Sequence, residues 1–189
     1  MKRTVLFLLA LCLLLPTLAG CSKETHSFDA AAVTAPAEAF PLSRVAGLTL
    51  SAPKDFSAEE QGYAWYAPNY PADGSCITIH TAATNPQFAS YTADHVKQAL
   101  EASYQASLEM PVTVTMDDFA FCTVAGFKAL QMEYHFTYRD IHMRCLQYLI
   151  QADQAYTVTC IQVAEAKWMT DFAAVAESLA FDWEIVSPA

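Results

Sequence analysis

The stretch VTVTMDDFAFCTVAGFKALQMEYHFTYRDIHMRCLQYLIQADQAYTVTCIQV, residues 112–163, decides the fold of this chain. It is dense in Val, Ile, Thr, Tyr and Phe, which favour the pleated, half-buried surface of a sheet. It contains one glycine, Gly126, and no proline. The pattern predicts four consecutive antiparallel strands at the centre of one folded domain.

Short connections set the expected register of these strands. Gly126 can take the positive φ of a tight turn, so the first turn is placed at residues 125–126. A second turn at residues 139–140 puts Tyr138 opposite Ile141. The third turn lies within residues 152–155, and its position stays open between a loop at 152–153 and a loop at 153–154.

This register gives the predicted sheet one apolar face and one mixed face. Side chains two residues apart share a face. The apolar face carries Leu130, Met132, Tyr134, Phe136, Met143, Cys145, Leu149, Tyr156, Val158 and Cys160. The mixed face carries Gln131, Glu133, His135, Thr137, His142, Arg144, Leu146, Tyr148, Ile150, Ile161 and Val163. The apolar face is expected to form a core, and the apolar end of the mixed face needs cover as well.

Outward from this centre, the periodicity of apolar residues predicts further elements. Strands are expected at 45–50, 63–66 and 76–81, and a short last strand at 181–185. Helical spacing predicts one helix within residues 88–110, with Thr92 as its N-cap, and another at 167–179. The predicted order is β-β-β-α-β-β-β-β-α-β. The fold class is therefore α+β, a mainly antiparallel twisted sheet packed by two helices.

The N-terminal segment has the layout of an export signal. A basic start precedes an apolar run at residues 5–15 that is too short to cross a bilayer. The tetrapeptide LAGC, ending at Cys21, resembles the lipobox of bacterial lipoproteins, and that resemblance implies acylation of Cys21. The expected organisation is a signal peptide at 1–20, a flexible tether at 21–41 and a single domain at 42–189. A cell-membrane, lipid-anchored, extracytoplasmic location follows.

Charge narrows the set of partners. The chain has a formal net charge of −10. Such an acidic chain has no electrostatic footprint for nucleic acid. An anionic membrane would repel it, so the lipid must provide the predicted attachment to the membrane.

Four cysteines remain beyond the signal and the lipobox: Cys76, Cys122, Cys145 and Cys160. None has the CxxC spacing of a zinc or thioredoxin-like motif. A loop at 152–153 would place Cys145 opposite Cys160, close to disulfide geometry. A loop at 153–154 would place them diagonally, an arrangement that disfavours the bond. Four buried free thiols are the alternative.

The common catalytic signatures are missing from the sequence. There is no GxSxG, and five glycines leave no material for a phosphate-binding loop. All four cysteines lie inside strand patterns, which favours burial over nucleophilic activity. We therefore expect no enzyme and no cofactor.

Two groups of residues are candidates for binding. His135, His142 and Arg144 share the mixed face, although Arg144 would repel a cation and no metal ligand set is predicted. Tyr66 and Tyr70 flank a loop at 68–74, and tyrosine is common at binding surfaces. For both groups the competing interpretation is structural: a solvated polar sheet face in one case and aromatic core filling in the other.

The order of elements resembles a known family. The segments AGLTLSAPKDF, FASYTADHVKQALEASY, VAGFKALQMEYHF and FAAVAESLAF are similar to small bacterial lipoproteins with a PsbP-like α/β-sandwich domain, over residues 46–183. The resemblance implies a non-catalytic binding or assembly module, held at the membrane by its lipid, whose partner is another envelope protein or a small solute. The alternative is a solute- or metal-binding lipoprotein. The resemblance carries over no catalytic residues.

Overall fold

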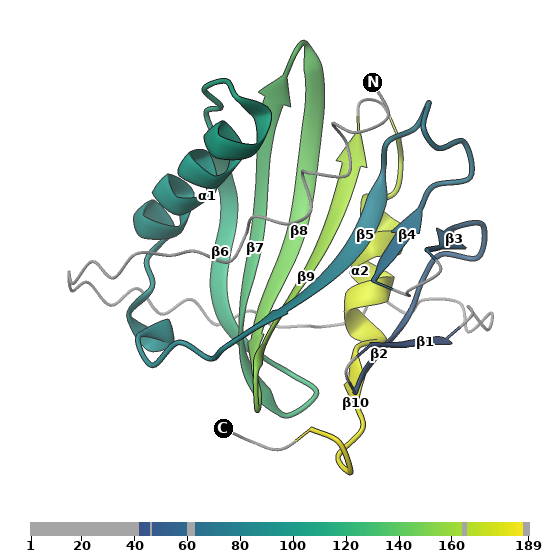
Figure 1. The fold of residues 1–189 in the computed structure, drawn as a ribbon, viewed down its shortest axis with the longest axis vertical. Coiled ribbons are helices and arrows are strands. Elements are labelled where there is room, and N and C mark those ends of the chain that lie inside the picture. The colour runs from purple at the N-terminus through teal and green to yellow at the C-terminus, as the bar shows by residue number, and fades with distance from the viewer. Residues whose placement is uncertain (1–41, 46, 60–62, 164–165, 187–189) are drawn as a thin grey trace.

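The computed structural model describes residues 42–45, 47–59, 63–163 and 166–186 (Figure 1). The predicted signal peptide, Cys21 and the predicted tether lie outside the described residues. The domain contains a seven-stranded sheet in the order β3-β4-β5-β9-β8-β7-β6 and a three-stranded sheet in the order β1-β2-β10. Every strand pair in both sheets is antiparallel.

The strands differ widely in length. The long strands of the large sheet are β5 (Cys76–Ala82), β6 (Thr115–Val124), β7 (Phe127–Tyr138), β8 (Ile141–Gln151) and β9 (Ala155–Val163). The short strands are β1 (Leu42–Val45), β2 (Leu48–Ser51), β3 (Ser57–Ala58), β4 (Ala64–Tyr66) and β10 (Ala180–Phe181). The four strands predicted from residues 112–163 are therefore present as β6 to β9.

Helices lie on both sides of the large sheet (Figure 1). A short 3-10 helix, η2 (Phe88–Ser90), precedes α1 (Ala93–Leu108), and α2 is Met169–Glu177. The Thr92 hydroxyl accepts a hydrogen bond from the backbone N–H of His95 at 3.3 Å, which confirms the predicted N-cap. None of the described helices is long and apolar enough to cross a membrane.

Each side of the sheet has its own core cluster. On the first side α1 packs Val96, Leu100, Tyr104 and Leu108 against β7, and the Tyr104 ring lies 4.4 Å from that of Phe136. On the second side α2 and β2 pack against the opposite surface of the same strands, through Phe172, Val175, Leu48 and Leu50 among others. The second cluster supplies the cover that the apolar end of the mixed face was expected to need.

The predicted turns of the first two hairpins are confirmed. Val124 lies opposite Phe127, and Tyr138 lies opposite Ile141. The third connection differs, because Gln151 pairs with Ala155 and leaves three residues in the loop. Neither of the two-residue loops considered from the sequence is present.

The longer loop overturns the predicted disulfide. Cys145 lies opposite Ile161, and Cys160 lies opposite Leu146. A shift of one residue sends a strand's side chains to the other face, so the two thiols belong to core clusters on opposite sides of the sheet. Neither thiol is part of a disulfide. For the same reason Tyr156 and Val158 pack on the α2 side, not on the α1 side as predicted.

The N-terminal strands also differ from the prediction. The single strand expected at 45–50 is a hairpin of β1 and β2 that reverses beside Gly47, whose φ is +84°. A side chain at Gly47 would run into Val186, so this turn needs glycine for space as well as for conformation. The large sheet gains the two-residue β3 at its edge. The fold class, α+β with a mainly antiparallel sheet and two packing helices, is confirmed.

Candidate functional site

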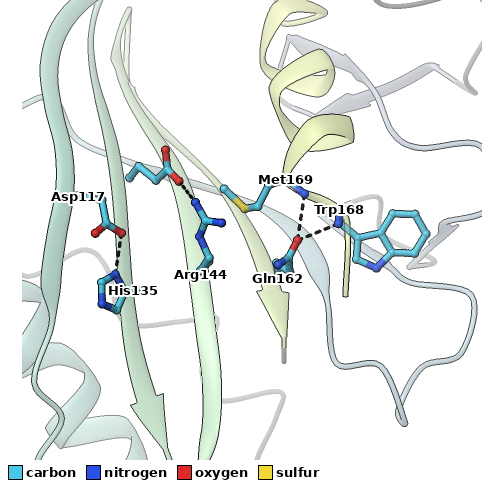
Figure 2. A network of polar contacts seen from close by, with 7 residues as sticks. Asp117, His135, Arg144, Gln162, Trp168 and Met169 are labelled. Carbon is cyan, nitrogen blue, oxygen red and sulfur yellow. Dashed lines mark hydrogen bonds and ion pairs between the residues drawn. The ribbon is translucent and has the colours of Figure 1, made fainter. Parts of the chain in front are cut away.

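A line of polar side chains crosses the α2 side of the large sheet. His135 on β7 lies opposite Arg144 on β8, which lies opposite Gln162 on β9. Asp117 contacts His135 (Figure 2). Glu133 contacts Arg144. We call these five residues the polar row. The structure therefore brings together the predicted His135 and Arg144, and His142 joins them with its ring centroid 5.3 Å from that of His135.

Two close contacts order the charged part of the row. His135 Nδ1 lies 2.7 Å from Asp117 Oδ2, and Arg144 Nη2 donates to Glu133 Oε1 at 2.5 Å. Between 29% and 43% of each of these four side chains is exposed. Pairs exposed to this degree contribute only about 0–1 kcal/mol to stability. Their main effect is to hold donors and acceptors in fixed positions at the surface.

A bulge in the edge strand explains how Asp117 reaches His135. Met116 pairs with Tyr134 and Asp118 pairs with Glu133, so Asp117 is the extra residue between two adjacent pairs. A bulge of this kind turns a side chain away from simple alternation. The sequence carries no signal for this bulge, and the Asp117–His135 contact could not be predicted from it.

The row continues into the start of α2 through Gln162. Its Oε1 accepts hydrogen bonds from the backbone N–H groups of Trp168 at 2.8 Å and Met169 at 3.1 Å (Figure 2). The first N–H groups of a helix have no partner within the helix, so Gln162 caps α2 from the sheet. The Trp168 indole N–H donates to Asp73 at 2.8 Å, which ties the helix start to the β4–β5 loop. Sequence reasoning missed this cap.

The predicted aromatic pair lies on the other side of the sheet. Tyr66 on β4 is opposite Cys76 and packs against the α1-side cluster. The rings of Tyr66 and Tyr70 lie 4.4 Å apart, tilted by 34°. Burial, reinforced by the nearby Glu59, raises the pKa of Tyr66 to about 12. The two candidate groups predicted from the sequence are therefore separate surfaces.

The described cysteines are buried or half-buried, and the described residues include no metal-binding cluster. Burial raises the pKa of the Cys76 thiol to about 12, with a smaller effect of Asp73, so at neutral pH this thiol is protonated and a poor nucleophile. Burial also raises the pKa of Cys122 and of Cys160. Within the part of the chain that the structure describes, no group of three or more His, Cys, Asp or Glu side chains could hold a metal ion.

Comparison with known proteins shows the fold. No protein-family model matches this chain, and neither does any curated protein. A solution structure of cyanobacterial PsbP (CyanoP) from Synechocystis sp. PCC 6803 is similar at 12% identity, with 83% of this chain and 98% of that chain covered and a TM-score of 0.58. The PsbP-like fold predicted from the order of elements is therefore confirmed.

Two further solved structures are similar over most of this chain. One is LpqN of Mycobacterium tuberculosis, described as involved in cell envelope biogenesis, at 13% identity, with 75% of this chain and 83% of that chain covered and a TM-score of 0.45. The other is a protein of Bacteroides thetaiotaomicron at 12% identity, with 72% of this chain and 45% of that chain covered and a TM-score of 0.41.

Proposed function

We propose that this chain is a lipid-anchored, non-catalytic lipoprotein of the cell envelope whose domain binds another envelope protein through the polar row. The lipid is attached at Cys21, and the domain faces the extracytoplasmic side. The observation that carries the binding proposal is the ordered, half-exposed set of charged side chains on the α2 side of β6, β7 and β8.

The row suits recognition of a polar protein surface. Asp117, Glu133 and Arg144 each use one atom in the contacts within the row, and each has further hydrogen-bonding capacity. His142 adds an exposed imidazole beside them. Side chains that are already ordered lose little conformational entropy on binding, and this makes the contact more favourable. The row contains both acidic and basic side chains. This combination suits contact with a polar protein surface and does not suit a cation site.

Site-specific photo-crosslinking in intact envelopes tests this proposal. A photoreactive amino acid at position 142 should give one discrete crosslinked species, and Arg144→Ala should abolish it. Gln105, an exposed residue of α1 on the opposite side of the sheet, is the matched control position. The binding proposal is wrong if position 142 gives no species, or if the species persists in Arg144→Ala or forms equally from position 105.

The anchor is tested separately. Cys21→Ser removes the acyl acceptor, so the protein should leave the membrane fraction and appear in the soluble extracytoplasmic fraction. The expectation rests on stable attachment through acyl chains, at about 0.8 kcal/mol per buried methylene. A Cys21→Ser protein that remains in the membrane fraction would refute the anchor without touching the binding proposal.

A further inference from the structure

An open cleft lies at the end of the domain where β10 leads into the last described turn (Figure 1). It has a volume of about 530 Å³ and is lined by Thr49 of β2 and by the consecutive residues Phe181, Asp182, Trp183 and Glu184. We call it the Trp183 cleft. The turn is fixed by its backbone, because the Asp182 N–H donates to the Gly47 oxygen at 2.8 Å and the Asp182 oxygen accepts from the Val186 N–H at 2.9 Å. The β6–β7 turn lies beside it, since a Cβ at Gly126 would be 3.4 Å from the Trp183 ring.

Trp183 gives the cleft an aromatic wall that is both exposed and fixed. It is 59% exposed, whereas Trp65 in the core is 2% exposed. The indole stacks on Phe127 of β7, with ring centroids 4.8 Å apart and planes inclined by 16°. Phe127 therefore covers one face of the indole, and the exposed area belongs to the opposite face and the ring edge. A ring held in this way loses little conformational freedom when a ligand binds.

The cleft is negatively charged. Asp182 and Glu184 flank Trp183 in the sequence and both line the cleft, while its described lining includes no Lys or Arg. The Glu184 N–H donates to Asp182 Oδ1 at 3.1 Å, which orders the turn beside the indole. No described residue forms an ion pair with Glu184. The hydroxyl of Thr49 donates to the backbone oxygen of Ala180 at 3.1 Å. The lining therefore offers a ligand negative charge and an aromatic face.

From these observations we propose that the Trp183 cleft binds a quaternary ammonium cation over the accessible face of the indole, beside Asp182 and Glu184. Tryptophan attracts cations more strongly than the other aromatic side chains, and nearby carboxylates add Coulombic attraction. A quaternary ammonium group has no N–H to satisfy, so an aromatic face and negative charge meet all its requirements. A guanidinium would also need acceptors placed in its plane. An anion would be repelled by both carboxylates.

The Trp183 cleft is separate from the polar row. Phe127 begins β7, and His135 lies eight residues further along the same strand, a separation of about 26 Å at the rise of an extended chain. The inference therefore goes beyond the proposed function and concerns another end of the molecule. Failure of either one leaves the other intact.

Calorimetric titration of the full chain with choline tests the proposal. The protein is kept in a maltoside detergent, which carries no quaternary ammonium group, and sodium chloride holds the ionic strength constant. We expect saturable binding with half-saturation at about 1 mM or below. The neutral carbon analogue of choline, in which a tert-butyl group replaces the trimethylammonium group, should bind about tenfold more weakly or worse, because it has the shape of choline without its charge.

Glycerophosphocholine distinguishes the two sources of such a cation, a free solute and a lipid headgroup. Its phosphate would lie close to two carboxylates, so we expect it to bind more weakly than choline. Weaker binding identifies the ligand as a free quaternary ammonium solute. Equal or tighter binding identifies it as a lipid headgroup.

Single substitutions connect the binding to the cleft. Trp183→Leu removes the aromatic face and should weaken choline binding about fivefold to thirtyfold. Glu184→Gln keeps the size of the side chain, removes one charge and should weaken binding about twofold to fivefold. Glu109→Gln is the matched control, because it removes the same charge from an exposed position after α1, on the other side of the sheet. It should bind choline as the original chain does.

A measurement on the unmodified protein covers the case in which Trp183→Leu fails to fold. The indole N–H resonance of Trp183 should shift with the same saturation curve as the calorimetric heat, while that of the buried Trp65 stays in place. The proposal is overturned by the absence of saturable choline binding, by equal binding of the neutral analogue, or by saturation that leaves the Trp183 resonance in place. Unchanged affinity in Trp183→Leu, or equal affinities of Glu184→Gln and Glu109→Gln, would overturn it as well.

Discussion

Replacing Gln162 with methionine isolates the contribution of the sheet-borne cap on α2. Methionine has a similar length and no acceptor oxygen, so the N–H groups of Trp168 and Met169 lose the partner they share at 2.8 Å and 3.1 Å. Only 8% of Gln162 is exposed, so water replaces the lost acceptor poorly. An unsatisfied buried donor costs about 1–3 kcal/mol. These two N–H groups are only part-buried, so together their loss should lower the free energy of unfolding by about 2–4 kcal/mol.

Equilibrium urea unfolding, followed by circular dichroism, measures this loss. Thermal unfolding should show the same loss as a fall in the melting temperature. At about 2–4 °C per kcal/mol for a domain of this size, this fall is roughly 5–15 °C. Gln162→Glu is the matched control. Its carboxylate can accept the same two hydrogen bonds, and a negative charge is favourable at a helix N-terminus and opposite Arg144.

A Gln162→Met protein within about 0.5 kcal/mol of the original chain would refute the capping argument, because such a change is no larger than that of an ordinary surface substitution. Equal losses in the methionine and glutamate variants would also refute it. They would mean that packing of the glutamine stem, and not its acceptor oxygen, stabilises the start of α2.

Three further predictions follow from the structure. Gly47→Ala should destabilise the domain by at least about 2 kcal/mol in urea unfolding, because alanine meets Val186 and is strained at a φ of +84°; unchanged stability would contradict the described turn. Burial lowers the pKa of His80, so on acidification the unfolded state binds a proton before the folded state does, and the free energy of unfolding should fall as the pH drops below about 6.5. His80→Gln should reduce this dependence of stability on pH, measured by thermal unfolding at pH 5 to 7. An unchanged pH dependence in His80→Gln would count against a role of His80. Iodoacetamide should label the half-buried Cys122 of the native protein before it labels the buried thiols. After denaturation, peptide mapping should find Cys145 and Cys160 in separate labelled peptides. A peptide in which Cys145 is linked to Cys160 would disprove the register of β8 and β9.

The turns of residues 112–163 show what local chemistry can specify. Gly126 marks the β6–β7 turn, where its φ is +91°, and the alternation on either side then sets which residues face each other. The juxtaposition of His135 and Arg144 follows from the second turn, at residues 139–140, which sets the β7–β8 register, and it was predicted correctly. The β8–β9 connection has no glycine, asparagine or proline to select a turn type. Its length could not be determined, and a difference of one residue reversed the faces of Cys160, Tyr156 and Val158.

The missed parts of the candidate site depend on contacts that no local pattern encodes. The Asp117 contact needs a bulge whose position is selected by the neighbouring strand. The indole of Trp168 finds Asp73 across 95 residues of sequence. The split of the expected strand at 45–50 did have a signal, because Gly47 interrupts the run and an isolated glycine within a strand pattern marks a bulge or a close approach.

The pairing of β2 with β10 has a consequence for the order of folding. The Thr49 hydroxyl donates to the backbone oxygen of Ala180, 131 residues away, and β5 pairs along its whole length with β9. Although β1 pairs with β2 and β4 with β5 locally, β2 and β5 each gain their second partner strand only when nearly all of the described chain is present. Sheets closed by such distant segments form slowly, since loop closure must precede the contacts that reward it. Late closure of this kind would keep the chain unfolded during its synthesis, which suits export before folding to the extracytoplasmic side proposed above.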